Sequence, residues 1–557
     1  MSGKAQRRCG VYRMSVFYMV SRKRVFDVSG WKPCYNNPRN GRLAWRKKSK
    51  EADMRYLAGI DNGGTFSKAA VFDEDGRQIS VASVPTVTIT PKSGYTERDM
   101  TELWQVNAKA VRSAVETSGI DPKSIAGVSL SGHGKGLYLV GKDGHPAYNG
   151  IISTDARAWE YVERWEKDGT KEKVYQKTFQ DILACQPVSI LAWMKDHAPQ
   201  ALENTQYIFA VKDYIRYMLT KEAYAEYTDF SGANLVNLTT HAYDRELLGC
   251  FGLEEIYEKL PPLRYSSDIC GYVTKEAAEF TKLPAGIPVA AGMFDVNACG
   301  IASGLSDEEQ MCMVAGTWSI NEFIRRSPVT NGTVALNSMF CIPGYYLIEE
   351  SSPTSAGNME WFIRNLLSYE KAEAKKEGKS VYDMTNQWVA EIEPQDCDII
   401  FLPFLNGSNE DPLAKGTFVG LTAYHNKKYM LRAVYEGIVF SHYTHVQKLL
   451  VNREKPKSIR LSGGAANSDV WVQIFADVLQ IPVDVIEDKE LGAQGAAMAA
   501  GIAAGIYPDY TAAVERTVKI SKTIYPRKEY AKVYEEKYQR YRAVIDGLCS
   551  AWKYFKN

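Results

Sequence analysis

Short apolar segments separated by turns follow one another directly after residue 54. Three of them are joined by short connections, the second of which is Asp73-Glu-Asp-Gly76. This arrangement predicts three strands linked by tight turns, that is, an antiparallel unit. Apolar residues at helical spacing then predict a helix, and another apolar run predicts a fourth strand. The predicted strands cover 56–60, 68–72, 78–84 and 125–130, and the predicted helix covers 100–116.

The same order returns, less regularly, in the second half of the chain. Three strand-like segments are followed by stretches with helical periodicity and by two further short apolar segments. The last stretch carries tyrosines at helical spacing, which indicates packing against a core. Strands are expected at 311–314, 319–324, 345–349, 458–461 and 483–486, and helices at 428–450, 469–479, 492–505 and 528–555.

Three antiparallel strands followed by a helix and a parallel strand are typical of ribonuclease-H-like domains. Two such units predict an α/β protein with two ribonuclease-H-like domains, as in actin-type ATPases, and a ligand cleft between them. A length of 557 residues is too great for one core and agrees with two domains. We expect an N-terminal lobe at 54–303, a C-terminal lobe at 304–510 and a helical extension at 511–557.

Composition narrows the class of protein. Apolar residues make up 45% of the chain and charged residues 24%, which is ordinary for a globular protein. No run of about 18 apolar residues occurs, so no membrane-spanning helix is expected. The ten cysteines include no CxxC pair and lie in apolar stretches, which is typical of reduced core residues. We therefore expect a cytoplasmic protein.

The first 53 residues differ in charge from the rest. They hold fourteen basic and three acidic side chains, whereas the remainder holds 53 basic and 63 acidic ones. Three interpretations are open: a basic tail for nucleic acid or membrane, an organellar transit peptide, or upstream sequence placed before the true start. We favour the last, because Met54 stands directly before the first predicted strand. The native protein is then expected to start at Met54, with 1–53 outside its fold.

Three turns of small residues, each at the end of a predicted strand, are candidate phosphate contacts. In Asp61-Asn-Gly63-Gly64-Thr65 the glycines let backbone N–H groups approach an anion, and the threonine adds a hydroxyl donor. Asp61 suits hydrated magnesium, which prefers one or two carboxylates with phosphates and waters. A plain glycine-rich hairpin is the alternative. The other two turns are Ala315-Gly316-Thr317 and Ser462-Gly463-Gly464-Ala465-Ala466-Asn467.

A single carboxylate, Asp295, stands in the apolar segment Ala290-Ala-Gly-Met-Phe-Asp295-Val. Burying a charge costs free energy, so a carboxylate kept there indicates a function. Beside a transferable phosphoryl group, such a side chain can accept the proton of a sugar hydroxyl. The structural alternative is the N-cap of a helix starting near Val296, and the two roles are compatible.

Other polar side chains of the first lobe are candidates for binding a sugar. The segment Ser131-Gly-His-Gly-Lys135-Gly lacks the Walker spacing and precedes an apolar run, so we assign Lys135 to the sugar. Asp155 and Arg157 offer a carboxylate and a guanidinium two residues apart, a pair suited to fixing a polyol. Glu97 precedes the first helix, where it either faces the sugar or serves as an acidic helix start.

Together these motifs resemble the FGGY family of carbohydrate kinases, from about residue 56 to the last residue. The likeness extends to Gly94-Tyr-Thr-Glu-Arg-Asp-Met100, Gln186-Pro-Val-Ser-Ile-Leu-Ala-Trp193 and Gly416-Thr-Phe-Val-Gly-Leu421. Lys135 falls where kinases of D-xylulose tend to carry histidine, so the sugar pocket should differ from theirs. The resemblance implies the following roles: Asp295 as catalytic base, Asp61 as the magnesium-associated acid, Thr65 and Thr317 as phosphate contacts, and Gly463 with Gly464 as the adenosine motif.

The resemblance also implies the reaction. ATP, with magnesium, would phosphorylate a terminal hydroxyl of a ketopentose, L-xylulose first, and the cationic Lys135 could suit the keto-sugar acid 3-keto-L-gulonate. The alternatives on this scaffold are kinases of L-ribulose, D-xylulose, glycerol or erythritol. A non-catalytic actin-like sugar sensor, chaperone or filament is the alternative from another class. The expected partner is a small sugar, without nucleic acid or membrane, and a homodimer is compatible with the sequence.

Overall fold

The computed structural model describes residues 31–34, 44–47, 54–487 and 490–555. The chain divides into two compact units, Met1–Met54 and Arg55–Asn557. In the first unit, strand β1 (Trp31–Cys34) pairs antiparallel with β2 (Ala44–Lys47). The rest of the basic leader lies outside the described residues, so a native start at Met54 stays a prediction.

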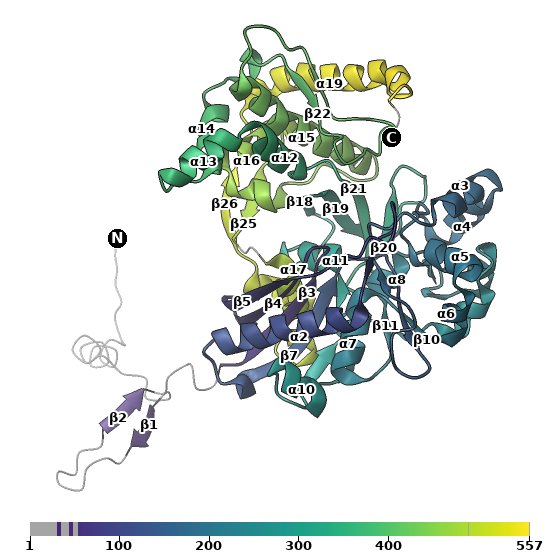
Figure 1. Cartoon of the computed structure of the whole chain (residues 1–557). Helices are drawn as coiled ribbons and strands as arrows, with labels where there is room; N and C mark the ends of the chain where they lie inside the picture. Colours follow the sequence, from purple (N-terminus) through teal and green to yellow (C-terminus); the bar gives the residue numbers. More distant parts are fainter. Residues whose placement is uncertain (1–30, 35–43, 48–53, 488–489, 556–557) are drawn as a thin grey trace, which may run out of the picture. The chain divides into compact units, whose positions relative to one another are not determined.

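The first large sheet of the second unit has the predicted order of elements (Figure 1). Its three leading strands are antiparallel, and the next strand runs parallel to the first of them. Three later strands join the sheet on that side, of which β17 (Met293–Phe294) pairs with the end of β7 (Ile125–Gly132) outside the main strand order. In spatial order the strands are β15 (Ile269–Tyr272), β16 (Pro288–Ala290), β7, β3 (Tyr56–Asn62), β4 (Phe66–Asp73) and β5 (Gln78–Pro85).

Helices cover both faces of this sheet. On one face α2 (Met100–Thr117) packs against β4 and β5, and Ser67 Oγ donates to Asn107 Oδ1 at 2.7 Å. On the other, α17 (Leu491–Ala503) packs against β3 and β7. The β3–β4 register pairs Asp61 with Lys68, so both side chains point to the face that α17 covers. Asp61, the predicted magnesium-associated acid, therefore lies beside α17, a helix from late in the chain.

Between β7 and β15 the chain forms a helical region with its own core, which carries several of the predicted sugar-binding residues. Two short strands, β8 (Tyr138–Gly141) and β10 (Thr205–Phe209), pair within it. Its helices are α3 (Trp159–Lys167), α4 (Thr170–Thr178), α5 (Pro187–His197), α6 (Pro199–Asn204), α7 (Val211–Thr220), α8 (Tyr227–Ser231) and α9 (Arg245–Cys250).

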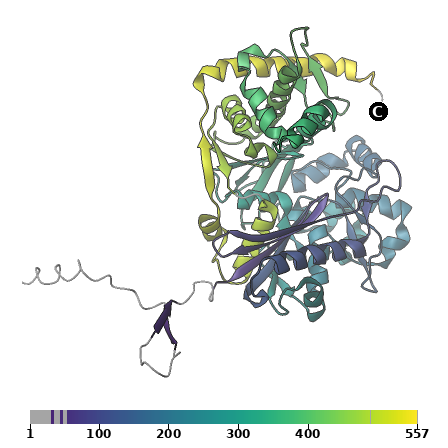
Figure 2. The same ribbon diagram turned by 60° about the vertical axis from the view of Figure 1, so that its left-hand side comes forward.

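The second sheet repeats the antiparallel-then-parallel pattern of the first. Helix α15 (Lys427–Leu450) packs on two of its strands, and α19 (Ala531–Trp552) lies outside, with Tyr534 and Tyr541 buried as the tyrosine stripe predicted. Figure 2 shows this lobe from a second direction. The strands in spatial order are β20 (Leu336–Met339), β21 (Tyr346–Ser352), β19 (Ser319–Arg325), β18 (Met311–Ala315), β24 (Ile459–Ser462), β25 (Val483–Ile486) and β26 (Ile520–Ile524).

Two features differ from the predicted division of the chain. Helix α17 follows β25 of the second sheet but packs on the first sheet and on α11 (Asp295–Ala302). The stretch 511–557, predicted as helical, contributes β26 to the second sheet. Only Ile520 and Ile524 are apolar in β26, whose side chains are exposed or half-buried, so its pattern gave little strand signal. Within the described parts of the chain, no helix combines the length and apolar character needed to cross a bilayer.

Candidate functional site

The turn between β3 and β4 presents the first candidate phosphate contacts. The Gly63 N–H donates to the Phe66 carbonyl at 3.0 Å and closes the hairpin. The buried guanidinium of Arg98 donates to the carbonyls of Gly63, at 3.4 Å, and Gly64. Gly64 and Thr65 themselves are exposed. The turn is therefore fixed from inside the lobe, while its outer face is accessible to an anion.

Asp61, at the end of β3, is held by its neighbours. Ser131 Oγ lies 2.9 Å from Asp61 Oδ1, to which it donates, and 3.0 Å from the carbonyl oxygen of Gly492 in α17. Burial raises the pKa of Asp61 above its usual range, whereas Ser131 and then Lys68 lower it. A cation bound nearby would offset this desolvation, so the carboxylate fits the expected magnesium-associated acid.

Asp295 is the first residue of α11, and Phe294 occupies the N-cap position, so Asp295 is not the N-cap. Burial raises the pKa of Asp295 well above its usual range, the carboxylates of Asp61 and Asp229 raise it further, and Lys135 lowers it. Such electrostatic effects require proximity. The structure therefore brings both predicted acids and Lys135 into one site.

A buried group of charged side chains beside Asp295 was missed by sequence reasoning. Lys212 Nζ lies 3.1, 3.5 and 3.4 Å from carboxylate oxygens of Asp213, Glu226 and Asp229. The Thr228 hydroxyl accepts the N–H of Phe294 at 2.9 Å and donates to Glu226 at 2.7 Å. This group thus fixes the backbone directly before Asp295. Its signal in the sequence, charged residues within the apolar stretches of α7 and α8, was too weak to interpret.

Replacing Asp229 with asparagine is expected to move the acid limb of the kcat/KM profile to lower pH. As the expected catalytic base, Asp295 would have to be ionised to accept a proton, and the negative charge of Asp229 contributes to its raised pKa. Burial raises the pKa of Asp229 itself to about 7, so this charge develops across the neutral range. Removing it lowers the pKa of Asp295 and extends activity to lower pH. Superimposable pH profiles of variant and wild type would contradict this coupling.

The two small-residue turns of the second lobe lie against each other. Thr317 is exposed in the β18–β19 turn, where the Gly316 carbonyl accepts the N–H of Ala356 at 2.7 Å. Gly463 has a φ of +86°, and a Cβ there would lie 2.7 Å from the carbonyl carbon of Ala315. Both the conformation and the close approach require glycine at 463. The second and third predicted turns therefore form one continuous surface.

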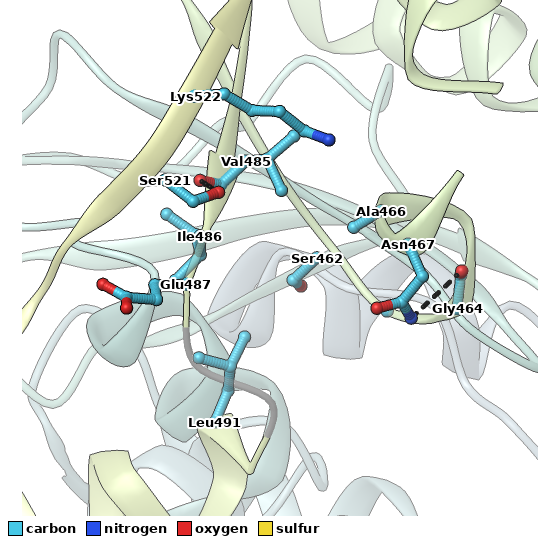
Figure 3. A pocket seen from close by; sticks show the side chains of 11 residues that line it. Ser462, Gly464, Ala466, Asn467, Val485, Ile486, Glu487, Leu491, Ser521 and Lys522 are labelled. Atoms are coloured by element: carbon cyan, nitrogen blue, oxygen red, sulfur yellow. Dashed lines mark hydrogen bonds between the residues drawn. The ribbon is translucent and has the colours of Figure 1, made fainter. Parts of the chain in front are cut away.

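A cavity of about 580 Å³ opens beside Gly463 and Gly464, a volume that suits a nucleotide-sized ligand (Figure 3). Asn467 also lines this cavity, which we call the β24–β26 pocket. Ala465, also predicted to contact the nucleotide, is fully buried in the core instead and is not among the lining residues. The described lining residues are Ser462, Gly463, Gly464, Ala466, Asn467, Val485, Ile486, Glu487, Leu491, Ser521 and Lys522.

Three predicted sugar-binding residues form one buried ion network. Arg157 Nη2 lies 2.8 Å from Glu97 Oε1 and 2.9 Å from Asp155 Oδ2. The guanidinium also lies over the ring of Tyr95, 4.3 Å from its centre. Among the described residues, Arg157 Nη1 is buried without a hydrogen-bond partner. The two carboxylates thus hold Arg157 in place, and Nη1 is the group left to bind a ligand.

Lys135 connects this network to Asp295. Its φ of +65° is uncommon for a side chain other than glycine, and its Nζ lies 5.4 Å from the centre of the Phe294 ring. The N–H of Gly136, the residue after Lys135, donates to the Cys185 carbonyl at 2.8 Å, and burial raises the pKa of the Cys185 thiol. In the part of the chain that the structure covers, Lys135 forms no ion pair. Its charge is therefore available to a ligand.

Known proteins share this sequence and fold. Residues 56–302 match the N-terminal domain, and residues 311–504 the C-terminal domain, of the FGGY family of carbohydrate kinases. The chain is 36% identical to the L-xylulose/3-keto-L-gulonate kinase of Escherichia coli K12, over 89% of this chain and 97% of that protein. A probable L-xylulose kinase of Pasteurella multocida is also 36% identical, over 89% of this chain and 99% of that protein.

Solved structures agree with the fold. The ligand-bound xylulose kinase of Lactobacillus acidophilus superposes with a TM-score of 0.82 at 23% identity, over 90% of this chain and all of that one. The family matches together span most of the second unit, and the E. coli relative is covered almost completely. The chain belongs to the FGGY family of carbohydrate kinases.

Proposed function

We propose that this kinase transfers the γ-phosphoryl group of ATP to a terminal hydroxyl of L-xylulose, and that it also accepts 3-keto-L-gulonate. The name of the E. coli relative motivates both sugars. Lys135 supports the acidic one, because it is a cation beside the proposed base without an ion-pair partner among the described residues. A carboxylate on the sugar would complete that pairing.

The proposed roles follow from the positions of the side chains. Asp295 accepts the proton of the attacking hydroxyl, and Arg157 Nη1 and Lys135 orient the sugar. The exposed backbone and hydroxyls of the 63–65 and 316–317 turns bind phosphate oxygens. Asp61 would hold magnesium, which neutralises charge on the transferred group when bound. A cytoplasmic location and a homodimer stay predictions.

Replacing Lys135 with methionine is expected to raise KM for 3-keto-L-gulonate by about 10- to 100-fold, the effect of losing one charge-assisted contact. KM for L-xylulose should rise much less, since that sugar has no carboxylate. Loss of the Lys135 charge also raises the pKa of Asp295, an effect on kcat that both sugars share. Lys92→Met is the matched control. Lys92 is an exposed lysine, and its Nζ lies 4.3 Å from the centre of the Tyr95 ring, the ring over which the Arg157 guanidinium also lies. Equal losses for both sugars in Lys135→Met would contradict a charge-specific role.

The experiment that tests the function is coupled ADP release with magnesium-ATP and a panel of sugars. The panel holds L-xylulose, 3-keto-L-gulonate, D-xylulose, L-ribulose, glycerol and erythritol. Turnover led by either of the first two supports the proposal. Turnover led by another sugar would keep the kinase and refute the substrate. The non-catalytic alternative loses its support with membership of a kinase family.

A further inference from the structure

The β24–β26 pocket contains a polar group that no described part of the protein satisfies. Ser462, the last residue of β24, has 4% of its surface exposed, and its Oγ has no hydrogen-bond partner among the described residues. A buried hydroxyl without a partner costs free energy, so such a group calls for an explanation. In Figure 3 its side chain lies in the middle of the lining residues, between the turn that holds Asn467 and the strand end that holds Ile486.

The character of the walls indicates which part of a nucleotide the pocket takes. One side of the pocket is apolar and consists of Val485, Ile486 and Leu491. The pocket is also lined by Lys522, whose charge is paired with Asp469 at the start of α16 (Asp469–Leu479). A phosphate site requires cations or clustered N–H groups. The candidate phosphate turns, 63–65 and 316–317, contribute no residue to the described lining of this pocket. A flat, largely apolar group with hydrogen-bonding edges fits these walls better than a phosphate does.

The position of the pocket also favours the nucleoside, and not the phosphates, as the part of ATP that it binds. Gly463 touches Ala315, directly before the 316–317 turn, and the pocket extends from Gly463 to Ser521 and Lys522 on β26. A nucleotide whose phosphates lie at the exposed turns would thus direct its nucleoside toward β26. Ser462 stands between these two ends, next to Gly463.

We propose that Ser462 is a further donor-binding residue, whose hydroxyl forms a hydrogen bond with the nucleoside of ATP. The inference rests on ATP as the donor and not on the identity of the sugar. The apo protein then contains an unsatisfied hydroxyl that the nucleotide satisfies on binding. This explains why a serine, and not a fully apolar residue, ends β24.

Binding calorimetry without sugar tests the proposal. Ser462→Ala is expected to raise Kd for ADP and for adenosine by the same factor, about five- to tenfold, the effect of one lost hydrogen bond. Binding of inorganic tripolyphosphate should stay unchanged. Weaker tripolyphosphate binding by the same factor would place Ser462 at the phosphates and overturn the proposal, as would an unchanged Kd for ADP.

A matched control and a stability measurement separate this role from a structural one. Ser458 directly precedes β24 but is not among the lining residues, and its hydroxyl donates to Asp484 Oδ2 at 2.6 Å, so Ser458→Ala should leave Kd for ADP unchanged. Thermal unfolding of apo Ser462→Ala should occur at the wild-type temperature or above it, because the unsatisfied hydroxyl is gone. A lower unfolding temperature would show that Ser462 supports the fold instead. Because ADP binding needs no sugar, silence in the sugar panel would leave this test intact.

Discussion

Asp295→Asn is expected to lower kcat by about 10²–10⁴-fold while ADP binding stays near that of the wild type. Asparagine keeps the shape of the side chain but cannot accept the proton of the sugar hydroxyl. The raised pKa of Asp295 adds to the expected loss of kcat, because a carboxylate with a raised pKa is a stronger base. The β24–β26 pocket contains no part of α11, so the nucleoside contacts should persist.

Single-turnover kinetics with saturating ATP and L-xylulose, beside ADP calorimetry, would measure both quantities. Asp121→Asn is a suitable control, because Asp121 is an exposed cap of the short 3₁₀ helix Pro122–Ser124, which precedes β7, whereas Ser131 of the site lies at the other end of that strand. A variant Asp295→Asn with wild-type kcat would refute the base role. Loss of ADP binding by the same factor as kcat would point to a misplaced α11 rather than to lost proton transfer.

The sequence sufficed for the parts of the site that consist of a strand end followed by small residues. Asp61, Gly316 and Gly463 became candidates in this way, because a buried strand and a turn leave a local pattern in the chain. Asp295 was found because one carboxylate interrupts an apolar run. These signals are local, and the structure places the corresponding residues at the expected ends of their elements.

The remaining features depend on contacts between distant segments. Thr228 supports the backbone of Phe294, and Ser131 contacts Gly492, yet neither serine nor threonine has a pattern that reveals such a partner. That Ser462 has no hydrogen-bond partner among the described residues likewise depends on β25 and β26, which line the same pocket and come from later in the chain. For Arg157 the sequence suggested one carboxylate neighbour, Asp155, but neither the contact with Glu97 nor that the two carboxylates would occupy most of its donors.

Helix α17 follows β25 of the second sheet and packs against α11, the helix that begins with the proposed base, Asp295. The small-residue stretch predicted a helix able to approach a neighbour closely, and its neighbours are β3 and α11. A Cβ at Gly59 of β3 would lie 1.8 Å from the Ala493 carbonyl oxygen, and one at Gly495 would lie 2.3 Å from the Ala298 carbonyl oxygen. Both clashes are with backbone, which cannot move aside as the end of a side chain can. Glycine at 59 therefore sets the distance between α17 and β3, and glycine at 495 sets the distance between α17 and α11.

Gly495→Ala is accordingly expected to impair stability and catalysis together. Overpacking against the α11 backbone should lower the free energy of unfolding by about 1–3 kcal/mol. Asp295 begins α11, one turn before Ala298, so a displaced α11 moves the carboxylate relative to the sugar hydroxyl. A shift of about 1 Å in such a group can lower the rate by about 10²-fold.

Gly547→Ala provides the matched control for this prediction. Gly547 is exposed in α19, and a Cβ there would meet nothing within 4 Å. Alanine in a helix interior is more favourable than glycine by about 0.5–1 kcal/mol, so this variant should be slightly stabilised and fully active. Denaturant unfolding and steady-state kinetics on both variants measure the contrast. If the two variants agreed in both unfolding free energy and kcat, the spacing of α17 and α11 would not determine the position of Asp295. A loss of kcat in Gly495→Ala alone would make that spacing part of the catalytic machinery.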